Sequence, residues 1–275
     1  MAKYNDIDKK NWREYSDIIT DSLWLIGRRD KSGAHDGSYH GNFVPQIPHQ
    51  LFARYTKRGD WILDAFMGSG TSLIEAQRMG RNSIGIELQQ SVAEDARLRI
   101  DSEHVDDIRA EVLIGDSRSI DLNAELERLQ IDAVQFVIMH PPYWDIINFS
   151  ESADDLSNAA SLEDFLKSFG RVIDNTTAVL EPDRYCAAVI GDKYAGGRVE
   201  PLGFYCMNEF LSRGFLLKAI VVKDFGETKA KAHLQNLWRY RALLGGFYVF
   251  KHEYIFVFRK KKPVRRRHKK FLNLE

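Results

Sequence analysis

The segment His140-Pro141-Pro142-Tyr143 contains the residue types that most directly suggest chemistry. Two prolines fix the backbone and remove two amide donors, so neighbouring carbonyl oxygens lack internal partners. A fixed carbonyl beside a polar side chain can accept both hydrogens of a planar NH2 group, and the rings of Tyr143 and Trp144 offer faces for a stacked base. This combination suits methyl transfer to an exocyclic amino nitrogen. The alternative is a strand-terminating proline turn with two packed aromatic rings.

A glycine-containing loop, residues 64–71 (DAFMGSGT), lies between a predicted strand and a predicted helix. Gly68 and Gly70 allow a sharp turn and a close approach to a ligand, and the helix that follows offers free amide groups. No lysine follows Gly70, which excludes a phosphate-binding P-loop, and the dinucleotide pattern GxGxxG is incomplete. The loop therefore indicates either a cofactor site or an ordinary tight turn.

Two carboxylates end the next two predicted strands. Glu87 lies 17 residues after Gly70, where an acid can accept both hydroxyls of a ribose, and Asp116 is placed to meet the exocyclic amine of a purine. Either residue alone could be a helix cap or a solvated loop acid. Together with the loop, they favour an adenosine-containing cofactor that is bound without a phosphate-binding loop.

The elements that must position these residues alternate along the chain. Strands are predicted at 61–66, 82–88, 111–114, 132–139, 185–190, 215–222 and 254–258, and helices at 71–79, 89–103, 161–180 and 201–212. Alternating strands and helices predict an α/β fold with a mainly parallel sheet. Such sheets bind ligands at the carboxyl ends of their strands, where the motifs above occur.

The residues DAFMGSGT, a strand ending in Glu87 and the later HPPY resemble the S-adenosylmethionine-dependent DNA amino-methyltransferases, which modify adenine N6 or cytosine N4. The resemblance covers roughly residues 41–260. Residues 41–56 resemble the segment that packs over the methionine end of the cofactor, and CAAVIGDKY and HEYIFVFRK resemble later strands. The implied fold is the Rossmann-like class I methyltransferase fold, with a mainly parallel seven-stranded sheet and helices on both faces.

The resemblance implies a role for each matching residue. The glycine loop would hold the methionine part of the cofactor, Glu87 the ribose and Asp116 the adenine amine. The expected contacts with S-adenosyl-L-methionine are Phe43, Pro45, Asp64, Phe66, Gly68, Gly70, Thr71, Glu87 and Asp116. The expected contacts with the target amine and base are His140, Pro141, Pro142 and Tyr143.

His140 departs from the family pattern, which has Asp or Asn for adenine and Ser for cytosine at this position. A neutral imidazole accepts a hydrogen bond through one nitrogen, and with an ordinary pKa of about 6.5 it is mostly neutral at pH 7. We therefore expect His140 to be a positioning acceptor rather than a general base, with activity that declines as the pH falls. Cytosine N4 and adenine N6 both stay open.

The charge distribution suggests a polyanionic partner. The chain has 39 basic and 39 acidic residues, but residues 259–270 contain nine Lys and Arg and no acid, which leaves the rest near −9. A target base must leave the duplex to meet the methyl donor. We expect residues 223–246 to be a recognition insert, or else a surface loop with an amphipathic helix. The expected DNA contacts are Trp144, Lys229, Lys231, Trp238, Arg239, Arg241, Arg265 and Arg266.

The predicted organisation is an N-terminal arm (1–40), a methyltransferase domain (41–260) and a basic tail (261–275). No apolar run approaches the ~18–20 residues of a membrane helix, and no secretory signal is apparent, so a cytoplasmic location is expected. Cys186 and Cys206 are too few for a disulfide scaffold and lack metal-ligand spacing, so no metal is expected. Neither lies in a loop typical of a nucleophile, which disfavours cytosine C5 chemistry.

The expected function is site-specific DNA methylation on cytosine N4 or adenine N6. Three alternatives remain: methylation of guanine N2 or another amine in RNA, methylation of a protein amide, and a catalytically silent DNA-binding subunit. A restriction endonuclease is a candidate partner, and the oligomeric state stays open.

Overall fold

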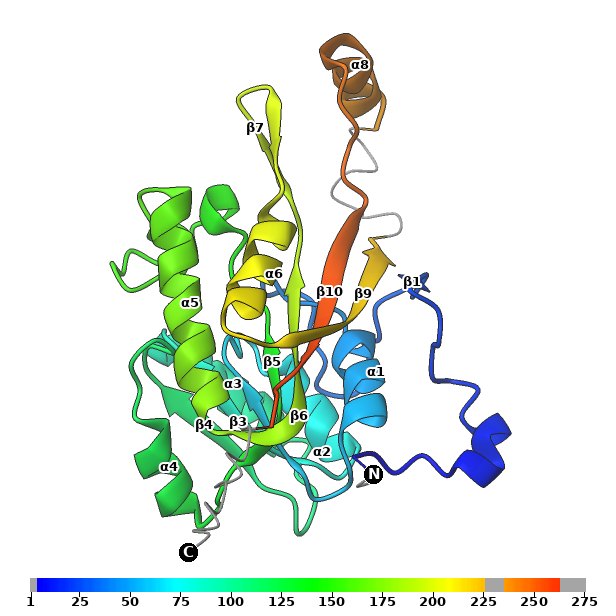
Figure 1. Ribbon diagram of the computed structural model, residues 1–275, viewed down its shortest axis with the longest axis vertical. Helices are drawn as coiled ribbons and strands as arrows, with labels where there is room; N and C mark the ends of the chain where they lie inside the picture. The colour runs from blue at the N-terminus through cyan, green and yellow to red at the C-terminus, as the bar shows by residue number, and fades with distance from the viewer. Residues whose placement is uncertain (1–3, 226–234, 263–275) are drawn as a thin grey trace, which may run out of the picture.

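The computed structural model describes residues 4–225 and 235–262, which form an α/β structure around one large sheet (Figure 1). The sheet is eight-stranded, in the order β1-β9-β10-β6-β5-β2-β3-β4. Its strands are β1 (Leu23–Trp24), β2 (Trp61–Asp64), β3 (Asn82–Glu87), β4 (Ala110–Ile114), β5 (Val134–Met139), β6 (Leu180–Ile190), β9 (Leu216–Asp224) and β10 (His252–Arg259).

The sheet is mainly parallel, as predicted. Strands β6, β5, β2, β3 and β4 run parallel to one another, whereas β10 is antiparallel to both of its neighbours, β6 and β9. The eighth strand was not expected: β1 comes from the predicted N-terminal arm and pairs with β9, with Leu23 opposite Val222 and Trp24 opposite Lys223. Trp24 is only 2% exposed, so its burial holds this short strand against the sheet.

Helices cover both faces of the sheet (Figure 1). On one face lie α1 (Gln46–Tyr55), α2 (Thr71–Arg78) and α3 (Gln90–Asp101), and on the other lie α4 (Leu122–Leu129), α5 (Leu162–Ala178) and α6 (Leu202–Ser212). The side chain of Ser161 accepts a hydrogen bond from the amide of Asp164 at 3.1 Å and so begins α5 where the sequence predicted a helix start. Helices α1 and α4 were not predicted.

The chain order of the strands creates a switch point in the middle of the sheet. From β2 the chain proceeds outward through β3 and β4, then returns to place β5 on the other side of β2. At such a point the loops after neighbouring strands diverge toward opposite faces and leave a crevice at the carboxyl ends. The glycine loop follows β2, and the proline motif follows β5.

Two elements extend beyond the body of the sheet at one end of the molecule (Figure 1). They are a hairpin of β7 (Lys193–Ala195) and β8 (Arg198–Glu200), and the helix α8 (Gln235–Gly245). The rings of Tyr194 and Phe247 stack with centroids 4.5 Å apart and join the two. Short 3-10 helices η1 (Lys9–Glu14), η2 (Trp144–Ile146) and η3 (Leu156–Asn158) lie in connecting segments. None of the helices in the described ranges is long and apolar enough to cross a bilayer.

Candidate active site

A pocket of about 470 Å³ lies at the switch point, at the carboxyl ends of β2, β3, β4 and β5. Its volume is typical of sites for small molecules and cofactors. It brings together residues that the sequence places far apart. The predicted site residues that line it are Phe43, Phe66, Gly68, Glu87, Asp116, His140, Pro141, Pro142 and Tyr143.

The glycine loop and Glu87 form one wall of the pocket. Gly68 has a φ of 52°, a left-handed conformation that favours glycine, and a Cβ there would lie 3.0 Å from Cε1 of Tyr39. The amides of Gly68 and Gln89 donate to the two carboxylate oxygens of Glu87 at 3.0 and 2.9 Å. Burial raises the pKa of Glu87, while these amide bonds act in the opposite direction. The carboxylate is therefore fixed at the pocket wall, and each oxygen keeps a further lone pair that can accept from a ligand.

Four predicted cofactor contacts do not line the pocket: Pro45, Asp64, Gly70 and Thr71. Asp64 is buried at the end of β2, where one oxygen accepts from the amide of Phe66 at 2.9 Å and the other accepts from the hydroxyl of Ser72. Burial raises the pKa of Asp64 to about 6. Its observed contacts, to Phe66 and Ser72, stabilise the conformation of the glycine loop from the side away from the pocket. A direct contact between Asp64 and a cofactor stays a prediction.

The other three residues likewise contact protein rather than the pocket. Gly70 is the N-cap residue of α2 and has a left-handed conformation, with φ 83°. The hydroxyl of Thr71 donates to Oδ1 of Asn42 at 2.8 Å and ties the glycine loop to the segment ahead of α1. Pro45 immediately precedes α1.

Asp116 lines the pocket but already has a charged partner. The Nε of Arg118 lies 3.0 and 2.9 Å from the two carboxylate oxygens of Asp116, and Arg118 Nη2 also contacts Asp154 at 2.6 Å. The sequence does not predict the ion pair between Asp116 and Arg118, because residues two positions apart in a loop follow no periodic pattern that would indicate contact. Asp116 remains an acceptor, since each carboxylate oxygen has more than one lone pair.

The proline motif forms the opposite wall. Among the described residues, no amide or side chain donates to the carbonyl of Pro141 or Pro142. The ring of His140 stacks on Phe43, and its Nε2 lies 3.3 Å from the hydroxyl of Tyr143. Burial lowers the pKa of His140 to about 4. The imidazole is therefore neutral at physiological pH, as expected, although it titrates well below the ordinary value, and its role as an acceptor for the target amine stays a prediction.

Two buried charged residues that line the pocket beside the motif were missed by sequence reasoning. The hydroxyl of Tyr143 donates to Oε2 of Glu253 at 2.7 Å, and the Nζ of Lys223 donates to Oε1 of Glu253 at 2.8 Å. Lys223 is 6% exposed and Glu253 is 4% exposed. Lys223 was expected to begin the DNA-recognition insert, but it belongs to β9 and contacts Glu253 at the wall of the pocket. The available signal for its place in the strand was the apolar run 219–222, which Lys223 directly follows.

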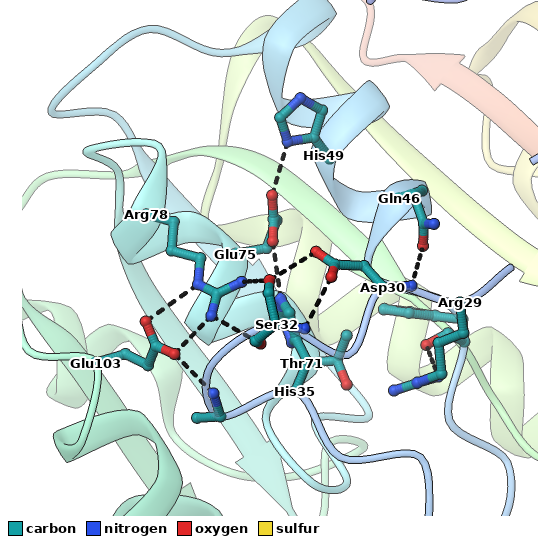
Figure 2. Close-up of polar contacts among 12 residues, drawn as sticks. Arg29, Asp30, Ser32, His35, Gln46, His49, Thr71, Glu75, Arg78 and Glu103 are labelled. Carbon is teal, nitrogen blue, oxygen red and sulfur yellow. Dashed lines mark hydrogen bonds and ion pairs between the residues drawn. The ribbon is translucent and has the colours of Figure 1, made fainter.

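The segment 29–43 passes beside the pocket and is anchored by polar contacts, of which the one between His35 and Glu75 is buried (Figure 2). Glu75 of α2 accepts from His35 Nε2 at 3.0 Å and from His49 Nδ1 at 2.7 Å. Arg78 pairs with Glu103 and donates to the carbonyl of Ser32 at 3.0 Å. We call residues 29–43 the strap. Its anchors hold Tyr39 and Phe43 against the glycine loop and the proline motif.

The residues of the pocket fit an S-adenosyl-L-methionine molecule. Gly68 permits a close backbone approach, while Glu87 and Asp116 supply acceptors for hydroxyl and amino groups. Arg29 of the strap also lines the pocket, and its buried Nε has no hydrogen-bond partner within the described ranges. An unpaired guanidinium donor beside the cavity suits the carboxylate of an amino acid.

The predicted DNA contacts are only partly placed. Trp144 does not line the pocket: its Nε1 donates to the carbonyl of Ala159 at 3.0 Å, and Lys193 Nζ lies 4.1 Å from its ring centroid. On α8, Arg239 and Arg241 are exposed and Trp238 is half-buried beneath the Arg241 guanidinium. The predicted contacts that fall outside the described residues are Lys229, Lys231, Arg265 and Arg266.

The sequence matches the model of a protein family described as DNA methylase, over residues 2–97 and 134–273. The chain belongs to the DNA methylase family. The matched ranges contain the glycine loop, Glu87 and the proline motif, while Asp116 lies between them. The predicted family is thereby confirmed, and S-adenosyl-L-methionine is confirmed as the cofactor at the level of the family and fold.

Curated relatives of this chain match it over short stretches. It is similar to the type II methyltransferase M.MjaII of Methanocaldococcus jannaschii, with 36% identity over 87 residues, which are 29% of this chain and 16% of that protein. It is 41% identical to the type II methyltransferase M2.DpnII of Streptococcus pneumoniae over 68 residues, 23% of this chain and 25% of the relative. The chain thus spans a quarter or less of the length of these relatives.

Solved structures confirm the predicted fold class. A methyltransferase from Pyrococcus furiosus superposes with a TM-score of 0.51 at 12% identity, covering 83% of this chain and 88% of the other. A putative class I S-adenosylmethionine-dependent methyltransferase from Listeria monocytogenes gives a TM-score of 0.50 at 13% identity, covering 79% and 59% of the two chains. At these identities the likeness concerns the fold alone.

Proposed function

We propose that this DNA methylase transfers a methyl group from S-adenosyl-L-methionine to the exocyclic amino group of a flipped base in DNA, at cytosine N4 or adenine N6. The observation that carries the proposal is the shared pocket. The glycine loop after β2 and the proline motif after β5 line the same cavity, so a cofactor and an amine can meet there.

Each residue of the pocket has a separate task in this proposal. Gly68, Glu87 and Asp116 hold the cofactor, which supplies an electrophilic methyl group. The carbonyls of the proline pair, together with the neutral imidazole of His140, accept the two amine hydrogens. Accepting both hydrogens orients the nitrogen lone pair and makes it a better nucleophile. The transfer would be a direct displacement in which the nitrogen–methyl bond forms as the sulfur–methyl bond breaks, the thioether leaves and the nitrogen releases one hydrogen to solvent as a proton, with no bond between the enzyme and the base.

Aromatic rings and exposed isoleucines suit the base itself. Tyr143 lines the pocket beside His140, and Ile146 and Ile147 lie exposed at its edge. Unstacking a base costs a few kcal/mol, which contacts with such apolar surfaces can offset. Arg239 and Arg241 on α8 would contact phosphates, because exposed guanidinium groups bind the backbone independently of sequence.

The proposal is tested by incubating the protein with methyl-labelled cofactor and either DNA or RNA of mixed sequence. We expect label in DNA and none above background in RNA. Label in RNA alone would support the alternative substrate. Labelling of neither, from a protein that binds the cofactor in a calorimeter, would contradict the proposed reaction.

A further inference from the structure

The proline motif rests on a buried charged pair that comes from the last two strands of the sheet. Lys223 on β9 and Glu253 on β10 are directly opposite each other in the antiparallel register. Their side chains meet at 2.8 Å, and Glu253 also accepts the hydroxyl hydrogen of Tyr143 at 2.7 Å. A charged pair is costly to bury, so its position against a candidate catalytic motif calls for a specific role.

Only one arrangement of hydrogens satisfies all the contacts from Lys223 through Glu253 and Tyr143 to His140. A lysine ammonium group has only donors and a carboxylate has only acceptors, so the single hydroxyl hydrogen of Tyr143 points to Glu253. The Tyr143 oxygen must then accept from any other partner. Its other side-chain partner is Nε2 of His140, at 3.3 Å. That nitrogen therefore carries the hydrogen, and in a neutral imidazole the lone pair is left on Nδ1.

We infer that Lys223 and Glu253 set the tautomer of His140 through Tyr143, so that Nδ1 is the acceptor presented to the target amine; the use of this acceptor rests on the proposed function. Within the described ranges Nδ1 has no hydrogen-bond partner, and the Phe43 ring stacked on the imidazole holds its plane. Lys223 and Glu253 are positioning residues in this account, since they act through Tyr143 and His140.

The low pKa of His140, about 4 because of burial, is consistent with this role. Only a neutral imidazole has an acceptor nitrogen whose position the tautomer determines, because the protonated ring has two donors and no acceptor. Burial also raises the pKa of Tyr143 well above its usual range, so its hydroxyl keeps the hydrogen that the chain of contacts requires.

Glu253→Gln is the informative substitution because it should reverse the direction of the hydrogen bonds from Glu253 through Tyr143 to His140. Lys223 still needs an acceptor and takes the new amide oxygen, which turns the amide NH2 group toward Tyr143. The Tyr143 oxygen then accepts from this amide, and its own hydrogen is free to point to Nε2 of His140. The predicted result is a hydrogen on Nδ1 instead, with no acceptor facing the amine.

Long-range nitrogen–proton NMR of histidine-labelled protein reads the tautomer directly, with the His140 signals assigned by their loss in His140→Asn. We expect the native protein to hold the hydrogen mainly on Nε2, and Glu253→Gln to shift it mainly to Nδ1. A native imidazole with its hydrogen on Nδ1 would overturn the inference even if the variant did not fold. An unchanged ratio in a folded Glu253→Gln protein would also overturn it.

Methylation kinetics supply an independent readout. Glu253→Gln should lower kcat about tenfold or more while cofactor affinity is unchanged, because only the amine acceptor is removed. Asp60→Asn, which removes a carboxylate from the Arg184 ion pair outside the pocket, should change neither kcat nor the His140 tautomer. If no methylation is found at all, the proposed function fails, but the NMR result still decides whether the tautomer is set as inferred.

Discussion

The imidazole of His140 stacks on the phenyl ring of Phe43, with centroids 5.0 Å apart and planes inclined at 29°. Phe43 belongs to the strap, ahead of the glycine loop, and His140 follows β5. The pair therefore joins the strap to the proline motif across the pocket. Because the stacked ring excludes water from one face of the imidazole, it contributes to the burial that lowers the pKa of His140.

The pH dependence of the methylation rate should reflect that low pKa. With a pKa of about 4, His140 stays neutral from pH 8 to about pH 6, and its acceptor disappears only as the pH approaches 4. The rate measured under single-turnover conditions should therefore show no decline with a midpoint near the ordinary histidine value. The free energy of unfolding should also fall with pH. In the unfolded chain His140 binds a proton below about pH 6.5, whereas in the native state it does so only near pH 4, so the native state loses stability between these two values.

His140→Asn should lower the methylation rate at neutral pH by about 10- to 100-fold, because the amide oxygen is an acceptor at a different distance from the amine. Cofactor affinity should be unchanged. His104→Asn, at an exposed loop position, is the matched control and should behave as the native protein. An unaltered rate and base preference in His140→Asn would remove His140 from the proposed mechanism.

Glu87→Gln should weaken cofactor binding, since a neutral amide replaces the carboxylate that we propose holds the ribose. A hydrogen bond to a charged group contributes about 1.5–3 kcal/mol, so the Kd measured by calorimetry should rise about 10- to 100-fold. Glu94→Gln removes an acid from the exposed face of α3 and should leave the Kd unaltered. Equal affinities for Glu87→Gln and the native chain would place the ribose elsewhere.

Glu75 should contribute stability that disappears in acid. Burial alone would raise the pKa of Glu75, but hydrogen bonds from His35 and His49 outweigh it and lower the pKa to about 2. A carboxyl with a lowered folded pKa stabilises the native state above about pH 4.5 and loses this effect as the pH falls toward 2. Glu75→Gln should cost about 2–4 kcal/mol in denaturant unfolding at pH 7 and flatten the acid limb, whereas Glu127→Gln on α4 should do neither.

Arg239 and Arg241 of α8 should act on DNA through phosphates. Replacing both by alanine should weaken binding to all sequences alike and reduce the salt dependence of log K by about 0.9 for each phosphate that the variant no longer neutralises. Arg128→Ala is a suitable control because α4 lies at the opposite end of the molecule (Figure 1). Weakened binding confined to one sequence would assign these arginines to base recognition.

The central architecture could be predicted because local patterns determine it. The buried runs of β2, β3 and β5 and the less buried edge strand β4 alternate with helices, and the motif residues Glu87 and His140 lie at or directly after strand ends. Helix α1 was missed because Pro45 and Pro48 suggest a break. Pro48 is tolerated because it lies in the first turn, where its missing amide would have no partner.

The contacts missed in the site join distant parts of the chain. Tyr143 and Glu253 are 110 positions apart, and His35 and Glu75 are 40 apart. No period or spacing in one sequence encodes such pairs, because they depend on how β10 lies beside β6 and how the strap crosses α2. Strand β1 was missed for a related reason: its two residues are too few for a pattern, and pairing with β9 alone defines it.

The most direct measurement for the proposed reaction is the identity of the nucleoside that gains an isotope-labelled methyl group. DNA is incubated with the native protein and labelled S-adenosyl-L-methionine, then digested and resolved by mass spectrometry. We predict label in N4-methylcytosine or N6-methyladenine, and its disappearance with Tyr143→Ala in the proline motif. Label in 5-methylcytosine, or undiminished label in that variant, would contradict transfer to an exocyclic amine held by this pocket.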